Sequence, residues 1–129
     1  MITISRYGSE SFNKDAVNFL LIFEHDFRYD DRNIPKFRHF SMSNFLRLLI
    51  AKNKWNDNLQ NFVRDQYRFD LDNSVKAEEG IELLKALTLA ENPVEFICDS
   101  DVLFDVCSAQ LASYLKANGL AVEIRGGNN

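Results

Sequence analysis

Residues 94–125 read VEFICDSDVLFDVCSAQLASYLKANGLAVEIR and contain three elements with short joints between them. Residues 94–98 are typical of a buried strand. Apolar side chains then recur at helical spacing over residues 104–115, and Asn118-Gly119 favours a helix end in the left-handed conformation. Residues 120–125 predict a second strand. A strand, a helix and a strand joined in this way form a βαβ unit, whose two strands are parallel.

The residues before this unit predict two more strands and four more helices. Residues 1–6 alternate apolar and polar side chains, which is typical of a short strand. Residues 11–23 carry apolar side chains at helical spacing and predict a helix. Residues 27–31 predict an edge strand with one solvent-exposed face. The remaining three helices are predicted from capping residues and apolar stripes: one after Ser41 or Ser43, one around residues 59–67, and one after Asp72-Asn73-Ser74.

These elements predict one three-layer α/β domain over residues 1–125, followed by a flexible tail at residues 126–129. The length of 129 residues and the 46% of hydrophobic residues fit one core. If the crossovers are right-handed, four parallel strands with helices on both faces give the most economical packing. The long helical passage between strands 2 and 3 lets strand 3 return beside strand 1, so the predicted order is 2-1-3-4.

This order predicts where a ligand binds. Ligands of open α/β sheets lie beyond the carboxyl ends of the strands, at the point where the strand order reverses, which here is between strands 1 and 3. Polar turns follow strands 1, 2 and 3, and a basic loop follows strand 2. The candidate ligand-binding residues are therefore Tyr7, Gly8, Ser9, Asp30, Arg32, Arg38, Asp99 and Ser100.

Arg32 is the predicted anchor of an anionic ligand. A guanidinium group can form two parallel, charge-assisted hydrogen bonds to a phosphate or carboxylate. Arg38 assists it, and Gly8, which has no Cβ, lets a ligand approach the main chain closely. Two alternatives remain: Arg32 forms a structural ion pair with Asp30 or Asp31, or the whole basic loop is a solvated surface.

Charge and composition argue against several classes of function. The net charge of −4 and the pI of about 5.1 predict no attraction to nucleic acid or to an anionic membrane. No apolar stretch is long enough to span a bilayer, no signal peptide is expected, and a cytoplasmic location follows. Cys98 and Cys107 are predicted to be free, buried thiols, and no metal site and no cofactor are predicted.

Several short motifs resemble, in the right order, the family catalogued as domain of unknown function 488. Residues 2–12 (ITISRYGSESF) resemble its opening strand and Tyr-Gly-x-x-Ser turn, residues 30–35 its Asp-x-Arg-x-x-Pro motif, and residues 39–41 the segment that follows. The family carries a Cys-x-Glu turn and then a Cys-His-Arg motif, where this chain has Cys98-Asp99-Ser100 and Cys107-Ser108-Ala109. The resemblance implies no particular reaction.

The sequence leaves two hypotheses for function and does not indicate an oligomeric state. The first is a small domain that binds a nucleotide-like or other anionic ligand at the carboxyl ends of the strands, with catalysis left open. The alternative is a non-catalytic protein-binding accessory or inhibitor protein, which the missing His and Arg of the family motif favour. It would use an acidic face of the central helices, formed by Asp57, Asp65, Asp70, Asp72, Glu78, Glu79 and Glu82.

Overall fold

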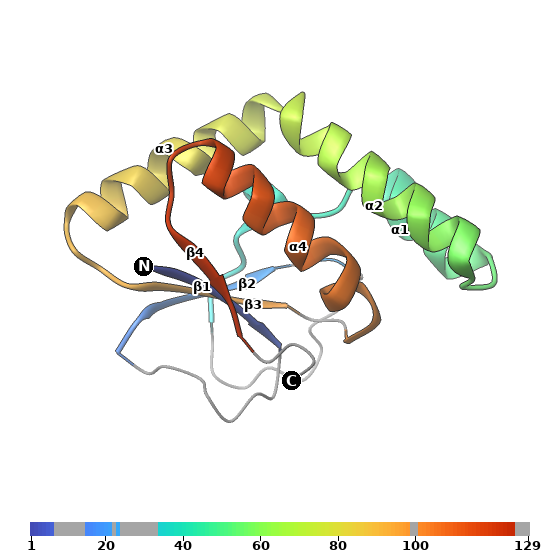
Figure 1. Cartoon of the computed structure of the whole chain (residues 1–129), viewed down its shortest axis with the longest axis horizontal. Coiled ribbons are helices and arrows are strands. Elements are labelled where there is room, and N and C mark those ends of the chain that lie inside the picture. The colour runs from blue at the N-terminus through green and yellow to red at the C-terminus, as the bar shows by residue number, and fades with distance from the viewer. Residues whose placement is uncertain (7–14, 22, 24–33, 99–100, 126–129) are drawn as a thin grey trace.

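Four strands form one parallel sheet in the part of the chain that the structure describes. The structure is a computed structural model, and it describes residues 1–6, 15–21, 23, 34–98 and 101–125 (Figure 1). The strands lie in the order β2-β3-β1-β4, and each neighbouring pair is parallel. The α/β class and the parallel sheet are therefore confirmed. The strands are β1 (Ile2–Arg6), β2 (Val17–Leu21), β3 (Val94–Cys98) and β4 (Val122–Ile124).

The strand order differs from the predicted order 2-1-3-4 at the two outer strands. β1 and β3 are neighbours as predicted, with Ile4 beside Phe96. However, β2 pairs with β3 instead of β1, and β4 pairs with β1 instead of β3. A helix is about 10 Å across, which is about twice the spacing between neighbouring strands. The two strands of a βαβ unit can therefore lie next to each other or have one other strand between them. The pattern of residues 94–125 does not distinguish these arrangements.

The second strand lies in a segment for which the sequence predicted a helix. Residues 17–21 form β2, whereas the helix was predicted over residues 11–23. That prediction was wrong for residues 17–21, where Asn18 is the one polar residue, because a short and largely apolar segment fits a strand of a parallel sheet as well as it fits helical spacing. Residues 11–14 of the predicted helix, and the strand predicted at residues 27–31, lie outside the described residues.

The helices downstream of residue 41 form where they were predicted. Serine side chains cap two of them: Ser43 Oγ accepts a hydrogen bond from the N–H of Leu46 at 3.2 Å, and Ser74 Oγ accepts one from Ala77 at 3.1 Å. Gly119 has a φ of 84° just after the last helix, as predicted. No helix within the described ranges is long and apolar enough to cross a membrane. The helical elements are the 3-10 helix η1 (Arg38–Phe40), α1 (Asn44–Lys52), α2 (Asp57–Asp72), α3 (Val75–Leu89) and α4 (Asp101–Ala117).

The described helices lie on one face of the sheet (Figure 1). Their buried side chains belong to the same hydrophobic cluster as Ile2, Ile4 and Phe96. The connections from β2 to β3 and from β3 to β4 run in the same direction across the sheet, and right-handed crossovers in one direction place their helices on one face. Helices on both faces were predicted. Within the described residues there is one helical layer, because β2 occupies part of the segment that was expected to supply the other.

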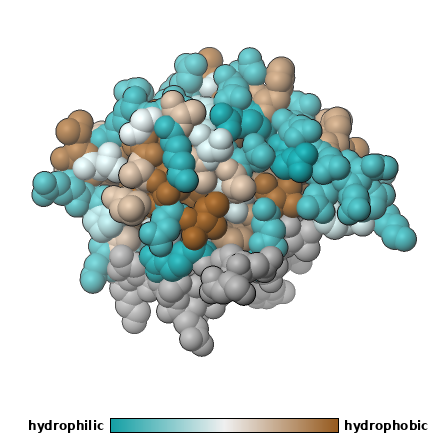
Figure 2. Space-filling view, in the orientation of Figure 1, coloured by the Kyte–Doolittle hydropathy of each residue, from teal (hydrophilic) through white to brown (hydrophobic). Residues whose placement is uncertain are grey.

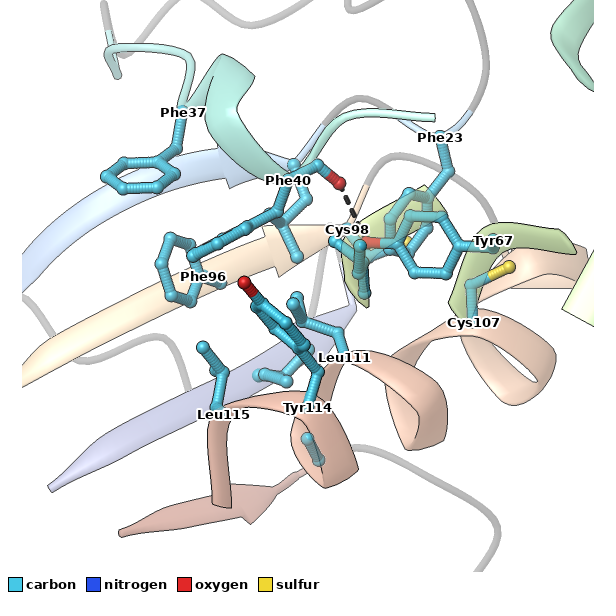
Figure 3. Packing of buried hydrophobic residues seen from close by; sticks show 14 of the residues in the cluster. Phe23, Phe37, Phe40, Tyr67, Phe96, Cys98, Cys107, Leu111, Tyr114 and Leu115 are labelled. Atoms are coloured by element: carbon cyan, nitrogen blue, oxygen red, sulfur yellow. Dashed lines mark hydrogen bonds between the residues drawn. The ribbon is translucent and has the colours of Figure 1, made fainter. Parts of the chain in front are cut away.

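Aromatic side chains fill the space between the sheet and this helical layer. The ring centroid of Phe37 lies 5.0 Å from that of Phe40 and 5.1 Å from that of Phe96 (Figure 3). The hydroxyl group of Tyr67 donates a hydrogen bond of 2.7 Å to the main-chain oxygen of Phe40 within this cluster. These contacts bind η1 and α2 to the middle of the sheet.

Neither cysteine forms a disulfide bond and both are buried, as predicted (Figure 3). Cys98 ends β3, and Cys107 lies within α4. Burial raises the pKa of Cys107 to about 12, so this thiol is protonated at neutral pH. Burial also raises the pKa of Tyr67 well above its ordinary value of 10, with a smaller contribution from Cys107 and Cys98. The thiol of Cys107 is thus part of the core.

Candidate anion-binding site

The predicted ligand site is at the carboxyl ends of β1 and β3, which lie side by side. Arg6, the last residue of β1, pairs in register with Cys98, the last residue of β3. The chain after β1 leads to β2 and the chain after β3 leads to β4, in opposite directions across the sheet. Each connection thus passes over the other's strand, whereas in the predicted order 2-1-3-4 the two connections lead away from each other, so the switch point was predicted from an order that this sheet does not have. The residues predicted to bind there, Tyr7, Gly8, Ser9, Asp30, Arg32, Asp99 and Ser100, lie outside the described residues and stay a prediction.

Arg6 is a described basic side chain at the ends of β1 and β3, and its contacts with α4 are structural. Its Nη2 atom lies 2.6 Å from Oδ1 of Asp105, and its guanidinium carbon lies 4.9 Å from the centroid of the Phe104 ring. Both partners belong to α4. Arg6 thereby ties the end of β1 to the first turns of the helix that covers it.

Arg38, the remaining predicted residue, lines a different pocket. This pocket has a volume of about 280 Å³ and lies where three segments meet. η1 and the residues after it form one side, the first turns of α1 form the second, and the beginning of α3 forms the third. Its described lining residues are Arg38, His39, Ser41, Met42, Ser43, Asn44, Arg47, Ser74 and Lys76.

Two helices begin at this pocket. Ser43 and Ser74 are the N-caps of α1 and α3, and each side chain accepts one hydrogen bond from a main-chain N–H group of the helix that it begins. The other N–H groups of a first helical turn have no acceptor within the helix, and the helix dipole adds a partial positive charge at that end. Two such ends near one pocket favour an anion.

The side chains of the pocket add full positive charges. Arg38, Arg47 and Lys76 line it, together with the imidazole ring of His39, and none of its described lining residues is acidic. Arg47 is oriented by a hydrogen bond from its Nη2 atom to the side-chain oxygen of Asn44. A guanidinium group that is held in one orientation can present its N–H groups to a phosphate without further ordering.

Three polar atoms of the pocket residues have no hydrogen-bond partner in the described part of the chain. They are Nδ1 of His39, Oγ of Ser41 and Nε of Arg47, and all three are shielded from solvent. Shielded polar groups in folded proteins are nearly always paired, because leaving them unpaired costs about 1–3 kcal/mol each. Three unpaired groups around one pocket are available to hydrogen-bond a polar partner, whether water or an anion.

A close approach between α3 and the side chains of η1 sets the shape of the pocket. Gly80, inside α3, lies against η1: a Cβ atom there would be 2.8 Å from Cβ of His39 and 2.9 Å from the ring of Phe40. The ring of Phe37 supports that of His39 at a centroid distance of 4.8 Å. Phe37 also donates its N–H to the main-chain oxygen of Leu20 in β2 at 2.8 Å. η1 is thus held between the sheet and α3.

Of the residues that line this pocket, Arg38 alone was predicted as a ligand-binding residue, although the sequence carries one further signal. Negative side chains are favoured in the first turn of a helix and positive ones in the last. The first turn of α1 has no acidic residue. That of α3 carries Glu78, but Lys76, the second residue of the helix, lies nearer its N-terminus. Basic residues so near two helix N-termini oppose the local electrostatic preference. Such a conflict is expected where function requires the charge.

The acidic face of the central helices is partly neutralised. A cavity of about 420 Å³ lies along α3, lined by Glu78, Glu79 and Glu82. Nearby basic side chains offset part of the negative charge of this face, and hydrophobic groups interrupt the hydrophilic ones on the side shown in Figure 2. The ion pairs on this acidic face are Asp65 with Arg64, Asp72 with Arg68, and Glu82 with Lys85.

The described residues contain no cluster of three His, Cys, Asp or Glu side chains that could hold a metal ion.

No protein-family model, no curated protein and no solved structure matches the chain. The resemblance to the family of unknown function therefore stays a prediction.

Proposed function

We propose that this protein binds a small anion carrying a phosphate group, in the pocket between η1 and the beginnings of α1 and α3. The observation that carries the proposal is the convergence of Arg38, Arg47 and Lys76 on two helix N-termini, with no acidic side chain among the described lining residues. A phosphate group presents several oxygen atoms, which suits a pocket whose donors come from three directions.

The chain as a whole is acidic, and this favours a compact ligand. The net charge of −4 would repel a long polyanion such as nucleic acid at a distance. Inside a small pocket, the nearest charges dominate because interactions between exposed charges fall off within about 8–10 Å at ordinary salt concentrations. A small phosphate compound feels the local basic cluster and is little affected by the acidic helices.

Calorimetric titration with inorganic phosphate tests the proposal. Arg38 is exposed, so Arg38→Ala should leave the melting temperature nearly unchanged. The substitution removes charge-assisted hydrogen bonds worth roughly 1.5–3 kcal/mol, so the affinity should fall about ten- to a hundredfold. Arg64→Ala is the matched control, since Arg64 is also partly exposed, pairs with Asp65 and does not line the pocket. Equal affinities for the two variants would contradict the proposal.

The same titration addresses the site first predicted at the sheet edge. If Arg32 anchors the anion there, Arg32→Ala lowers the affinity and Arg38→Ala has a smaller effect. The proposed pocket requires the reverse order. If wild-type protein shows no binding of phosphate, sulfate or nucleotides at millimolar concentration, the anion-binding function itself is wrong and the protein-binding alternative takes its place.

A further inference from the structure

The proposed pocket continues into an apolar groove along α1. This groove has a volume of about 470 Å³, and its described lining residues are Asn44, Arg47, Leu48 and Ala51. These residues are spaced by three, four and seven positions, so they lie on one face of the helix. Asn44 and Arg47 also line the basic pocket. The two cavities therefore adjoin along the first turn of α1.

The polarity changes along this face of the helix. The first turn of α1 contributes Asn44, the Arg47 guanidinium and the helix N-terminus to the lining, and the next turn contributes Leu48 and Ala51. The side chain of Leu48 is 56% exposed, although it is large and apolar. Ala51 is exposed as well and leaves room beside it. A ligand that spans both cavities would bring a charged group to one end and cover apolar surface at the other.

We infer, on the basis of the proposed function, that the ligand is a dissolved phosphate monoester with an apolar substituent. Its phosphate group lies among Arg38, Arg47 and Lys76, and its substituent lies along α1 against Leu48 and Ala51. A groove of this size accommodates a hydrocarbon or aromatic group, because ligand cavities commonly span about 300–1,000 Å³. The charge selects the head group, and the apolar lining selects what is attached to it.

A series of alkyl phosphates tests this inference. Inorganic phosphate, methyl phosphate, butyl phosphate and hexyl phosphate are titrated into the protein at constant ionic strength. Full burial of a methylene group is worth about a fourfold gain in affinity, so about a two- to fourfold gain for each added methylene is expected in an open groove. Equal affinities for methyl and hexyl phosphate, with inorganic phosphate still bound, would overturn the inference and leave the proposed function standing.

Variants locate the effect on α1. Leu48→Ser should abolish the dependence on chain length and leave the affinity for inorganic phosphate unchanged, and the exposure of Leu48 means that the variant should fold. Leu89→Ser is the matched control, because Leu89 is 84% exposed on α3 and lines neither cavity. If both variants keep the dependence on chain length, the groove on α1 is not the site of the substituent and the inference fails.

Two further outcomes separate the alternatives. If wild-type protein binds none of the phosphate compounds, both the proposed function and this inference are wrong. Phosphatidic acid in a vesicle presents the same head group on a membrane. Binding to such vesicles without any gain from butyl to hexyl phosphate in solution would show a membrane ligand, and would overturn the inference of a dissolved one.

Discussion

Lys76 is the second residue of α3, where a positive charge opposes the helix dipole. We predict that Lys76→Glu stabilises the fold by about 0.3–1 kcal/mol, because a negative charge near a helix N-terminus is favourable. The same substitution places a carboxylate in the proposed pocket, so the affinity for phosphate should fall by more than tenfold. Urea unfolding and calorimetry measure the two effects separately.

Lys116→Glu is the control for the opposite effects of Lys76→Glu on stability and on phosphate binding. Lys116 lies in the last turn of α4, where a positive charge is favourable, and it does not line the pocket. Lys116→Glu should therefore lower stability slightly and leave phosphate binding intact. If Lys76→Glu and Lys116→Glu change binding equally, the charge at position 76 acts through the net charge of the protein and not through the pocket.

The buried thiol of Cys107 makes stability depend on pH. Its pKa is raised from 9.0 to about 12 in the folded protein, through burial. Between these two values the unfolded chain loses a proton that the folded chain retains, so unfolding becomes easier as the pH rises. The contribution of this thiol to stability is complete below pH 9 and falls above it by up to about 1.4 kcal/mol per pH unit. Tyr67, whose pKa is also raised by burial, acts in the same direction.

Urea unfolding at pH 7, 9, 10 and 11 checks this dependence. Cys107→Ala should be less stable than wild type at pH 7, because it leaves a small cavity, but it should lose less stability between pH 9 and 11. Parallel losses in the two proteins would mean that Cys107 ionises in the folded state at its ordinary pKa, and that its surroundings are not as apolar as the structure indicates.

Among the elements, the contact between α3 and η1 determines the shape of the pocket. Gly80→Ala would gain about 1 kcal/mol from helix propensity, but its Cβ would lie 2.8 Å from Cβ of His39. Overpacking of this kind costs about 1–3 kcal/mol, so we expect a net loss of stability and a displaced η1. Because η1 carries Arg38, the affinity for phosphate should fall as well.

Gly119→Ala distinguishes a displaced η1 from a general loss of stability. Gly119 has a φ of 84° and open space around it, so an added Cβ strains the backbone without touching another residue. This variant should lose about 1–2 kcal/mol of stability and keep its affinity for phosphate. If Gly80→Ala also keeps its affinity, the position of η1 does not control the pocket.

The sequence predicted those elements whose signals are local. Ser43 and Ser74 cap α1 and α3 as expected, because a capping serine acts on N–H groups within its own helix. β2 was mistaken for a helix because Val17–Leu21 is a short, largely apolar segment with Asn18 as its one polar residue, and so lacks the regular alternation that marks a strand. Secondary structure was therefore predictable where a specific side chain marks it, and ambiguous in a short, largely apolar segment.

At the scale of the whole molecule, the sequence predicted the parallel sheet and the pairing of β1 with β3. It did not predict which outer strand pairs with which, since right-handed crossovers permit both orders. The basic pocket escaped prediction for a related reason. Arg38, Arg47 and Lys76 come from three separate segments, and only the packing of η1 against α3 brings them to one place.

An NMR titration of ¹⁵N-labelled protein with inorganic phosphate tests the pocket most directly, because it reports the place of binding. If phosphate binds in the pocket, the largest chemical-shift changes occur at the main-chain N–H groups of residues 44–46 and 75–77, which begin α1 and α3, and at the side-chain Nε–H of Arg47. Largest changes at residues 7–9 and 99–100, with the beginnings of α1 and α3 unaffected, would contradict binding in the pocket and place the anion at the carboxyl edge of the sheet.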